Sequence, residues 1–488
     1  MAGTFKKPFT LRLPATKQTR ITQYLKKKKS WSAKIMKSKL KTRRGGRLTD
    51  NKKYLGIHGV TEREDFQNLG KMTHTIEMTK IKTLLELGKS VCEVCINGTA
   101  CGTGFLLFEK FILTNAHVVR DIINGNMQQL SQPVTVKFEE LSLLNIVGHI
   151  PVEETLTAYR FGCDSSNHFL DYALLQLAGS LENLPSGLLP PGLLSKCSHS
   201  PHKGQICIIG HPQGGVKKMA VAFITEYEKR NMAFDKYFAE NPGHMAAIAG
   251  SLLKGKWDFK EMENPRLMTY DTSFLYGSSG SPVFQDHCQL VSLHTGGYPY
   301  EKDGKSYSIH EYAIPIMNIV QDILCELLES KVMQNHQKLD CLKKFSSEAL
   351  RGSQDIVCMI AWFMTEVLLK FRLNQIYPKA LQVLLGAVKG TTRHVKTQLR
   401  KALRDAMDTK PSLKGISQQG LLELANTEEE QSSMATLRRF LFSEQRRVLK
   451  DICLNVLADD KQKRKKSGKA KGRPGRQRKM QKKELMRL

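Results

Sequence analysis

The sequence predicts a mainly β protein, in which a β-rich body precedes a small α-helical module and both ends of the chain are disordered and basic. Two observations support this prediction. Between residues 90 and 330, short runs of β-branched and aromatic residues are bounded by glycine, asparagine and proline, a texture typical of sandwiches and barrels. Beyond residue 330, apolar residues recur at helical spacing.

The expected elements follow one another along the chain. Residues 1–75 form a disordered basic arm with its linker, and a helix over residues 76–88 ends at Gly88. Strands are expected at residues 104–108, 111–114, 134–138, 172–177, 205–209 and 290–294, before a helix at about residues 315–330. The β-rich body thus occupies residues 76–330. The helical module, residues 331–458, has helical spacing at residues 356–371, 380–388, 395–407, 420–424 and 437–457, and residues 459–488 form the second disordered tail.

The net charge separates the globular body from the two ends. Residues 1–49 hold 16 Lys and Arg and no acid, and residues 461–488 hold 14 against one acid, Glu484. These ends carry +16 and +13, which sum to the whole net charge of +29, so the body between them is neutral. Such ends suit polyanions, and we expect them to contact DNA.

Composition also excludes several classes of protein. No run of about 18 apolar residues exists, so no transmembrane helix and no membrane partner are expected. The cationic N-terminus lacks the apolar stretch of a secretory signal. Eleven cysteines, an odd number scattered over 55.2 kDa, indicate free thiols in a reducing compartment. Together with the basic ends, these features predict a nuclear protein.

Three short segments of the β-rich body carry catalytic residue types. They are Thr-Asn-Ala-His-Val-Val at residues 114–119, Leu-Asp-Tyr-Ala at residues 170–173 and Gly-Ser-Ser-Gly-Ser-Pro at residues 277–282. A serine hydroxyl becomes a nucleophile when a neighbouring base takes its proton; histidine can be that base, and a buried carboxylate can orient the histidine. Alone, each segment is a common strand end, cap or turn. Together, in the order His, Asp, Ser, they predict a catalytic triad.

This order within an all-β stretch resembles the chymotrypsin-fold serine proteases, which consist of two packed six-stranded β-barrels with the triad between them. The resemblance implies a serine endopeptidase in which His117 is the general base, Asp171 orients it and Ser279 is the nucleophile. It also implies that the N–H groups of Gly277 and Ser279 form the oxyanion hole. No metal and no cofactor are expected.

The same resemblance places the primary specificity pocket. Its base lies six residues before the nucleophile, at Ser273, and its opposite wall comes from His294, Thr295, Gly296 and Gly297. A neutral base is expected to accept aromatic or Leu side chains rather than Lys or Arg. In secreted trypsins an Asp precedes the nucleophile and pairs with a freshly cut N-terminus. This chain has Ser278 there, so another device must order the oxyanion hole.

Residues 84–329 resemble a narrower group, the nuclear trypsin-like proteases of the "family with sequence similarity 111". The shared motifs are Lys-Ser-Val at residues 89–91, Ile-Gly-His-Pro at 209–212, Thr-Tyr-Asp-Thr at 269–272 and Gly-Ser-Ser-Gly-Ser-Pro-Val-Phe at 277–284. The resemblance implies a chromatin protease of DNA replication and repair that cleaves protein substrates, including DNA–protein crosslinks and itself, and binds the sliding clamp (PCNA). His211 is expected to shape a strand end and not to act as a second base.

The N-terminal arm contains a candidate clamp-binding box. Gln18, Ile21, Tyr24 and Leu25 fit the spacing Gln-x-x-aliphatic-x-x-aromatic-aromatic, although Leu25 stands where an aromatic residue is usual. In such a box Ile21 and Tyr24 project from one helical turn as an apolar plug. The alternative is an incidental apolar cluster in a disordered arm. Together with the protease resemblance, the spacing favours clamp binding.

Two further motifs have plain interpretations. Gly-Arg-Pro within residues 471–476 resembles an AT-hook, but a nuclear-import signal centred on residues 463–466, with non-specific DNA contacts, is the preferred interpretation. Cys92, Cys95 and Cys101 have no fourth ligand at a metal-binding spacing, so core thiols are expected.

Two questions stay open at the level of sequence. The module at residues 331–458 is compatible with DNA binding, with a lid on the protease, or with dimerisation, which would make the protein a homodimer. The chain is either an active nuclear protease or a clamp- and DNA-binding scaffold with a catalytically inactive protease fold. The intact triad favours the active protease, because a scaffold has no reason to keep three separated residues of the right types.

Overall fold

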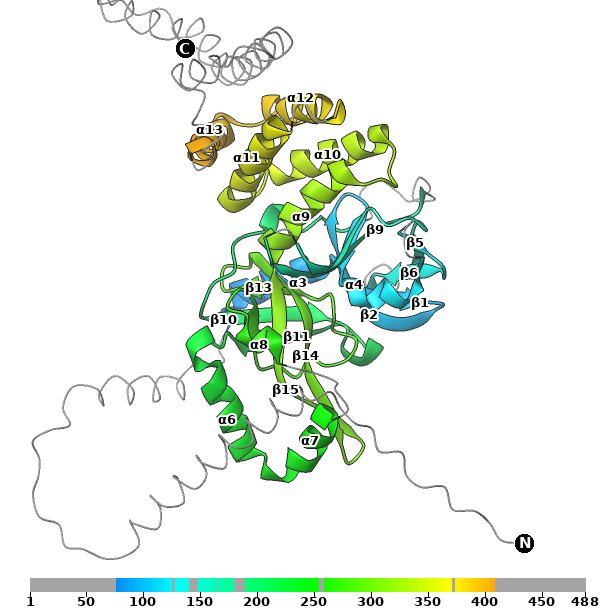
Figure 1. The fold of residues 1–488 in the computed structure, drawn as a ribbon, viewed down its shortest axis with the longest axis vertical. Coiled ribbons are helices and arrows are strands. Elements are labelled where there is room, and N and C mark those ends of the chain that lie inside the picture. The colour runs from blue at the N-terminus through cyan, green and yellow to red at the C-terminus, as the bar shows by residue number, and fades with distance from the viewer. Residues whose placement is uncertain are drawn as a thin grey trace, which may run out of the picture. The chain divides into compact units, whose positions relative to one another are not determined.

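The computed structural model describes residues 76–408, apart from residues 125–127, 140–147, 165, 180–188, 254–258 and 371–373. The chain divides into two compact units, Met1–His74 and Thr75–Leu488, and every described residue belongs to the second. Two large antiparallel sheets, one two-stranded ribbon and a set of helices build the described residues (Figure 1). None of the helices within the described residues is long and apolar enough to span a membrane.

The first sheet is a barrel of seven strands, one more than the resemblance implies. Helix α3 (Met78–Gly88), which ends at Gly88 as predicted, precedes it. The strands follow the order β7-β6-β1-β2-β3-β9-β8. A bridge between Val152 and Leu177 joins the chain after β7 to the chain after β9, so the sheet curves back on itself. The bounds are β1 Val91–Ile96, β2 Thr99–Phe108, β3 Phe111–Thr114, β6 Val134–Lys137, β7 Ile150–Pro151, β8 Ala158–Cys163 and β9 Phe169–Gln176, with a separate ribbon of β4 Ile123–Asn124 and β5 Gln129–Leu130.

The second sheet is a barrel of six strands in the order β11-β10-β13-β14-β15-β12. A bridge between Ile224, directly after β11, and Tyr270 of β12 joins its two edges. Its bounds are β10 Gln205–Gly210, β11 Lys218–Phe223, β12 Met268–Tyr270, β13 Pro282–Gln285, β14 Leu290–Lys302 and β15 Lys305–Pro315. The two closed antiparallel sheets confirm the predicted double-barrel class, and each predicted strand overlaps a strand of the structure.

Alternating apolar residues fill the barrels. Val134 and Val136 of β6 point inward and their neighbours are half-buried, as expected for a strand with one face in the core. The interior of the second barrel is a separate cluster that includes Ile206, Ile208 and Val283. These rigid interiors hold the strand ends, and the turns that follow them, in fixed positions.

A helical insert lies between β11 and β12, where the sequence analysis expected no helix. It consists of α6 (Arg230–Glu240), α7 (Met245–Leu253) and α8 (Lys260–Glu263). Phe234 of α6 and Ile248 of α7 belong to the same buried cluster as Tyr298 and Tyr300 of β14. The insert therefore packs against the long β14–β15 hairpin, as Figure 1 shows.

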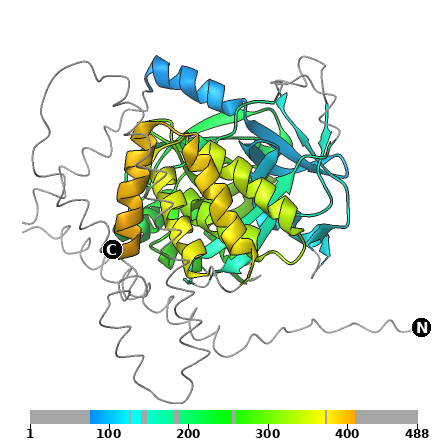
Figure 2. The same ribbon diagram turned by 90° about the horizontal axis from the view of Figure 1, so that it is seen from above.

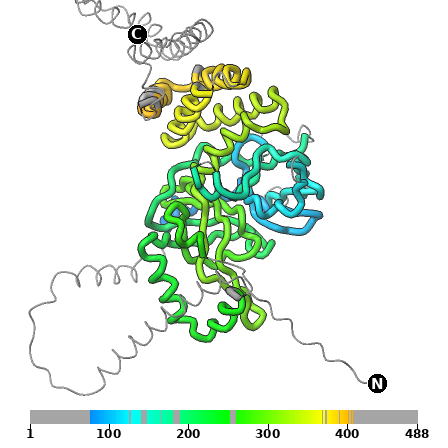
Figure 3. Tube along the Cα trace, viewed as in Figure 1, coloured from blue at the N-terminus to red at the C-terminus, as the bar shows by residue number. Residues whose placement is uncertain are grey.

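Five helices follow the second barrel. They are α9 (Ile316–Glu329), α10 (Asn335–Ala349), α11 (Gln354–Leu369), α12 (Ile376–Lys389) and α13 (Arg393–Asp408). All but α10 confirm a predicted helix, whereas the helices expected at residues 420–424 and 437–457 lie outside the described residues. Helices α10–α13, yellow to orange, lie together over the barrels in Figures 2 and 3.

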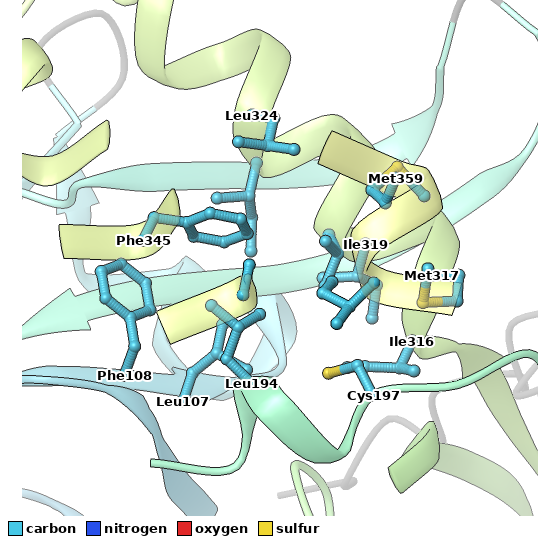
Figure 4. Packing of buried hydrophobic residues seen from close by; sticks show 14 of the residues in the cluster. Leu107, Phe108, Leu194, Cys197, Ile316, Met317, Ile319, Leu324, Phe345 and Met359 are labelled. Carbon is cyan, nitrogen blue, oxygen red and sulfur yellow. The ribbon is translucent and has the colours of Figure 1, made fainter. Parts of the chain in front are cut away.

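These helices share one hydrophobic cluster with the barrels (Figure 4). The ring of Phe345 on α10 meets Phe108 of β2 edge-on, with 5.2 Å between ring centroids. At the α10–α11 corner, the Ser353 hydroxyl donates to the Cys197 carbonyl oxygen at 2.5 Å. The helical region is thus packed on the two barrels through a continuous core.

Candidate active site

His117 and Asp171 lie together because the strands that precede them are neighbours. β3 ends at Thr114, which pairs with Ala173 of β9, so the short helix α4 (Ala116–Val119) begins beside the start of β9. Asp171 accepts two hydrogen bonds from His117, one from ring Nδ1 at 2.7 Å and one from the backbone N–H at 3.0 Å. Only 4% of the Asp171 side chain is exposed, against 32% for His117. A buried carboxylate bound to Nδ1–H leaves Nε2 as the basic nitrogen.

Ser279 lies in a tight turn before β13. Gly277 and Gly280 on either side have φ angles of +83° and +90°, a region that glycine adopts without strain. A Cβ on Gly280 would lie 1.9 Å from the carbonyl oxygen of Thr103, and one on Gly277 would lie 2.8 Å from that of His211. The two glycines are therefore a steric requirement of this turn.

Residues of the first barrel are hydrogen-bonded to this turn, which precedes β13 of the second barrel. Thr103 of β2 is fully buried; its N–H donates to the Ser279 carbonyl oxygen, and its hydroxyl donates to the Gly277 carbonyl oxygen, both at 2.8 Å. The Asn115 amide donates to the Asp171 carbonyl oxygen at 2.8 Å and to the Thr295 hydroxyl at 3.3 Å. Sequence reasoning gave neither Thr103 nor Asn115 a role, although Asn115 lies two residues before His117.

The Ser279 hydroxyl rests against β14. It donates to the Thr295 carbonyl oxygen at 3.2 Å, and within the described part of the chain no hydrogen bond joins it to His117. Bonds between a nucleophile and its base are commonly long in substrate-free proteins and tighten when substrate binds.

The amides of this turn are arranged as an anion site. Ser278 and Gly280 donate their N–H groups to the carbonyl oxygens of Leu275 and His294, at 3.1 and 2.9 Å. Among the described residues, the N–H groups of Gly277 and Ser279 find no such acceptor. Two neighbouring free amides can bind the oxyanion of a tetrahedral intermediate.

Comparison with known proteins identifies this region. The family described as the trypsin-like peptidase domain matches residues 102–293. This region is similar to trypsin-like peptidases. The matched stretch runs from β2 into β14 and includes His117, Asp171 and Ser279.

Two curated relatives are serine proteases by name and confirm the resemblance to the "family with sequence similarity 111". Serine protease FAM111A of Mus musculus is 31% identical over 303 residues, which are 59% of this chain and 45% of the relative. Serine protease FAM111B of Homo sapiens is 28% identical over 270 residues, which are 53% of this chain and 35% of the relative. The chain thus spans less than half the length of either relative.

Among solved structures, the active form of the Rv3671c protease from M. tuberculosis is similar to this chain. It is 15% identical with a TM-score of 0.31, and the match covers 57% of this chain and 93% of that one.

The residues expected around the specificity pocket of the peptidase domain differ in their surroundings. Ser273 is exposed, whereas His294 and Thr295 are buried. The His294 ring is bonded to Tyr270 and Ser278 and is not directed to solvent. Gly296 and Gly297 are half-buried, so these two glycines are the part of the expected wall that a substrate can reach.

Sequence reasoning missed Glu311, which pairs with Gly297 across β14 and β15. A Cβ on Gly297 would lie 2.1 Å from Glu311 Oε2, so this carboxyl occupies the space beside the wall glycine. Glu311 is 3% exposed, and burial raises its pKa to about 8. The wall is therefore neutral at neutral pH. A single Glu in an alternating strand carries no signal of burial, because acids usually mark the exposed face.

The buried Glu311 makes stability depend on pH. The unfolded chain releases this proton near pH 4.5 and the folded protein near pH 8, so the folded state holds more protons between these values. The free energy of unfolding therefore falls as pH rises through this window, by at most about 1.4 kcal/mol per pH unit. We expect Glu311→Gln to raise the urea midpoint more at pH 8.5 than at pH 5. An equal gain at both values would refute this origin, and the exposed Glu301→Gln is the control.

The other motifs from the sequence analysis have different outcomes in the structure. His211 lies directly after β10, where its Nδ1 is 3.0 Å from the Gly215 carbonyl oxygen, as expected for a residue that shapes a strand end. Cys92 and Cys95 are buried thiols, but Cys101 is exposed and was wrongly expected in the core. The clamp-binding box of Gln18, Ile21, Tyr24 and Leu25, like both basic ends, lies outside the described residues.

Proposed function

We propose that this chain is a serine endopeptidase with His117, Asp171 and Ser279 as its catalytic triad. The observation that carries the proposal is the His117–Asp171 pair, which is joined by two hydrogen bonds. It lies in the same peptidase-like region as a glycine-bounded serine turn, two of whose N–H groups have no acceptor among the described residues. The curated relatives, both serine proteases by name, support it.

The mechanism follows from the roles of these groups. Ser279 Oγ attacks the scissile carbonyl carbon while His117 Nε2 takes its proton. Asp171 stabilises the imidazolium that forms, and the N–H groups of Gly277 and Ser279 bind the oxyanion. The imidazolium then protonates the leaving amine, which departs and leaves an acyl group on Ser279. A water molecule, activated by the same histidine, hydrolyses that ester and restores the enzyme.

The environment of Gly297 supports a preference for aromatic or Leu residues before the cleaved bond. Ser273 carries no charge, and the Glu311 carboxyl is protonated at neutral pH because burial raises its pKa to about 8. Neither group attracts a Lys or Arg side chain below that pH. Glu311 is nevertheless the acid nearest Gly297. The preference for aromatic or Leu residues should therefore weaken at a pH high enough to ionise the Glu311 carboxyl.

Cleavage-site mapping tests both the endopeptidase activity and this preference. A denatured protein digested by the full chain at pH 7 should yield internal cuts after Leu, Phe and Tyr, identified by mass spectrometry of the new termini. The Ser279→Ala chain, treated in parallel, removes cuts from contaminating proteases. Cuts dominated by Lys and Arg would show that the pocket assignment is wrong, and the absence of internal cuts would show that the chain is not an endopeptidase.

We further propose that the enzyme works in the nucleus on chromatin- or replication-associated proteins, including DNA–protein crosslinks and its own chain. The concentration of the whole net charge of +29 in the two ends supports DNA contact. The spacing of Gln18, Ile21 and Tyr24 supports binding of the sliding clamp. An inactive scaffold with the same partners is the competing candidate, which the cleavage experiment also tests.

The C-terminal tail should carry a salt-dependent part of DNA binding. Deleting residues 461–488 removes a charge of +13. Each phosphate contact contributes about −0.9 to the slope of log K against log salt on duplex DNA, so the deletion should flatten this slope. Filter-binding titrations at several salt concentrations measure it. A variant with every Lys of the tail changed to Arg should keep the slope, and a deletion that keeps the full slope would exclude the tail as a main contact.

A further inference from the structure

The turn that carries Ser279 is held by a buried side chain within it. The fully buried Ser278 donates its N–H to the Leu275 carbonyl oxygen at 3.1 Å, and its hydroxyl donates to the same oxygen. Both bonds tie the start of the turn to its centre. They fix the peptide planes between residues 275 and 279, and these planes include the two amides assigned to the oxyanion hole.

Ser278 is in turn bonded to His294 of β14. His294 Nε2 lies 3.2 Å from Ser278 Oγ, and His294 Nδ1 lies 2.8 Å from the Tyr270 hydroxyl of β12. His294 is 2% exposed and Tyr270 is fully buried. The three side chains therefore form a continuous hydrogen-bonded line from the far wall of the second barrel to the nucleophile turn.

One arrangement of protons satisfies every bond in this line. The only proton of the Ser278 hydroxyl goes to the Leu275 carbonyl oxygen, so His294 Nε2 must be the donor to Ser278 Oγ. A neutral ring with Nε2–H has Nδ1 as acceptor, and the Tyr270 hydroxyl supplies the proton to it. Burial lowers the pKa of His294 to about 3, which agrees with a neutral ring.

We propose that Tyr270, His294 and Ser278 form an uncharged positioning chain that holds the oxyanion hole of this enzyme in its active shape. The inference rests on the proposed function and names what orders the site. In this chain a serine and a neutral histidine do the work that an acid paired with a new N-terminus does in secreted trypsins. The hole is therefore ordered without cleavage of the chain.

The other side of the turn is anchored independently. Thr103 bonds the carbonyl oxygens of Gly277 and Ser279 from the first barrel, and the backbone of His294 exchanges bonds with Gly280 and Ser281, each at 2.9 Å. These contacts keep the turn in place when the hydrogen bonds of the His294 side chain are removed. Losing the His294 ring should therefore loosen the peptide planes of the turn and leave the barrels folded.

Kinetics of matched variants test the catalytic part of the proposal. In His294→Leu, kcat should fall roughly 10- to 100-fold because the oxyanion donors are misplaced, while KM stays nearly constant. His294→Gln keeps an N–H that can reach Ser278 and should recover part of the loss. Tyr270→Phe, the mildest change, should lower kcat in the same direction. His310→Leu is the matched control, since His310 is 4% exposed on β15 and its ring lies against Phe234 of α6; no hydrogen bond or ring contact within the described residues joins it to the turn.

Inhibitor binding separates positioning from a general loss of stability. A peptide boronate forms a tetrahedral adduct whose oxygen needs the hole, so its affinity should fall in parallel with kcat. The cleaved product peptide, which lacks this oxygen, should bind His294→Leu as it binds the unchanged protein. Equal losses for both ligands, or the same kcat in the His294→Leu and His310→Leu variants, would overturn the positioning role.

NMR spectroscopy tests whether the hydrogen-bonded chain of Tyr270, His294 and Ser278 exists, independently of peptide hydrolysis. In ¹⁵N–¹H correlation spectra of histidine rings at pH 7, the full chain should show one neutral ring with a protected Nε2–H and an accepting Nδ1. This signal should vanish in His294→Leu. An Nδ1–H or a doubly protonated ring at His294 would overturn the proposal, whereas an inactive protein with the expected signal would overturn the proposed function alone.

Discussion

Replacing Ser279 with Ala should slow peptide hydrolysis about a millionfold, the usual cost of removing the nucleophile of a triad. The residual rate comes from the oxyanion amides and substrate binding, which the change leaves in place. Within the described residues the Ser279 hydroxyl makes one hydrogen bond, to the Thr295 carbonyl oxygen, so the fold should be retained. Initial rates on a Leu-containing peptide, together with circular dichroism of both proteins, measure the two effects.

Ser200→Ala is the matched control for this change. Ser200 is also a half-buried serine whose hydroxyl donates to a backbone carbonyl, that of Val291, but it lies outside the active site. Its loss should leave the rate unchanged. If Ser279→Ala and Ser200→Ala hydrolyse the peptide equally fast, Ser279 is not the nucleophile.

The second large effect concerns stability. Phe345→Ala should lower the free energy of unfolding by about 3–5 kcal/mol, because it opens a cavity where α10 meets the first barrel. Phe345 is fully buried and packs against Phe108 of β2. Since the core is continuous, Trp362 fluorescence on α11 and peptidase activity should be lost in one urea transition. The change should move both midpoints together.

Phe161→Ala is the control for aromatic truncation, since Phe161 is 43% exposed on β8 and should cost far less. Activity that persists after the Trp362 signal has changed would show that the helices are a separate folding unit. In that case the module at residues 331–458 would act on the peptidase domain from outside its core.

The barrels could be predicted from sequence because their strands carry their own signals. The apolar run at residues 111–114 is β3, with the same bounds. The glycines around Ser279 predict a turn with positive φ angles, and Gly277 and Gly280 have them. The triad residue types were visible for a similar reason: each lies within three residues of a strand end, beside an apolar run that marks the strand. What brings them together is the strand order, which local patterns do not contain.

Other features depend on contacts that a local pattern cannot reveal. Helix α10 buries Cys341, Leu342 and Phe345 on one face, but the lysines and acids around them hide its periodicity. His294 was expected at the pocket wall because its segment is there. The strand carries its ring into the barrel, where Tyr270 and Ser278 satisfy it. In both cases the residues that pack against the segment in the folded protein, more than its own sequence, determine what it does.

The central claim is that Ser279 is the nucleophile of a triad with His117. It is tested most directly by treating the full chain with a fluorophosphonate, which reacts with activated serines, and mapping the adduct by peptide mass spectrometry. The account predicts a single adduct on Ser279 that is lost when His117 is changed to Ala. An adduct on another serine, labelling that survives His117→Ala, or no adduct at all would contradict it.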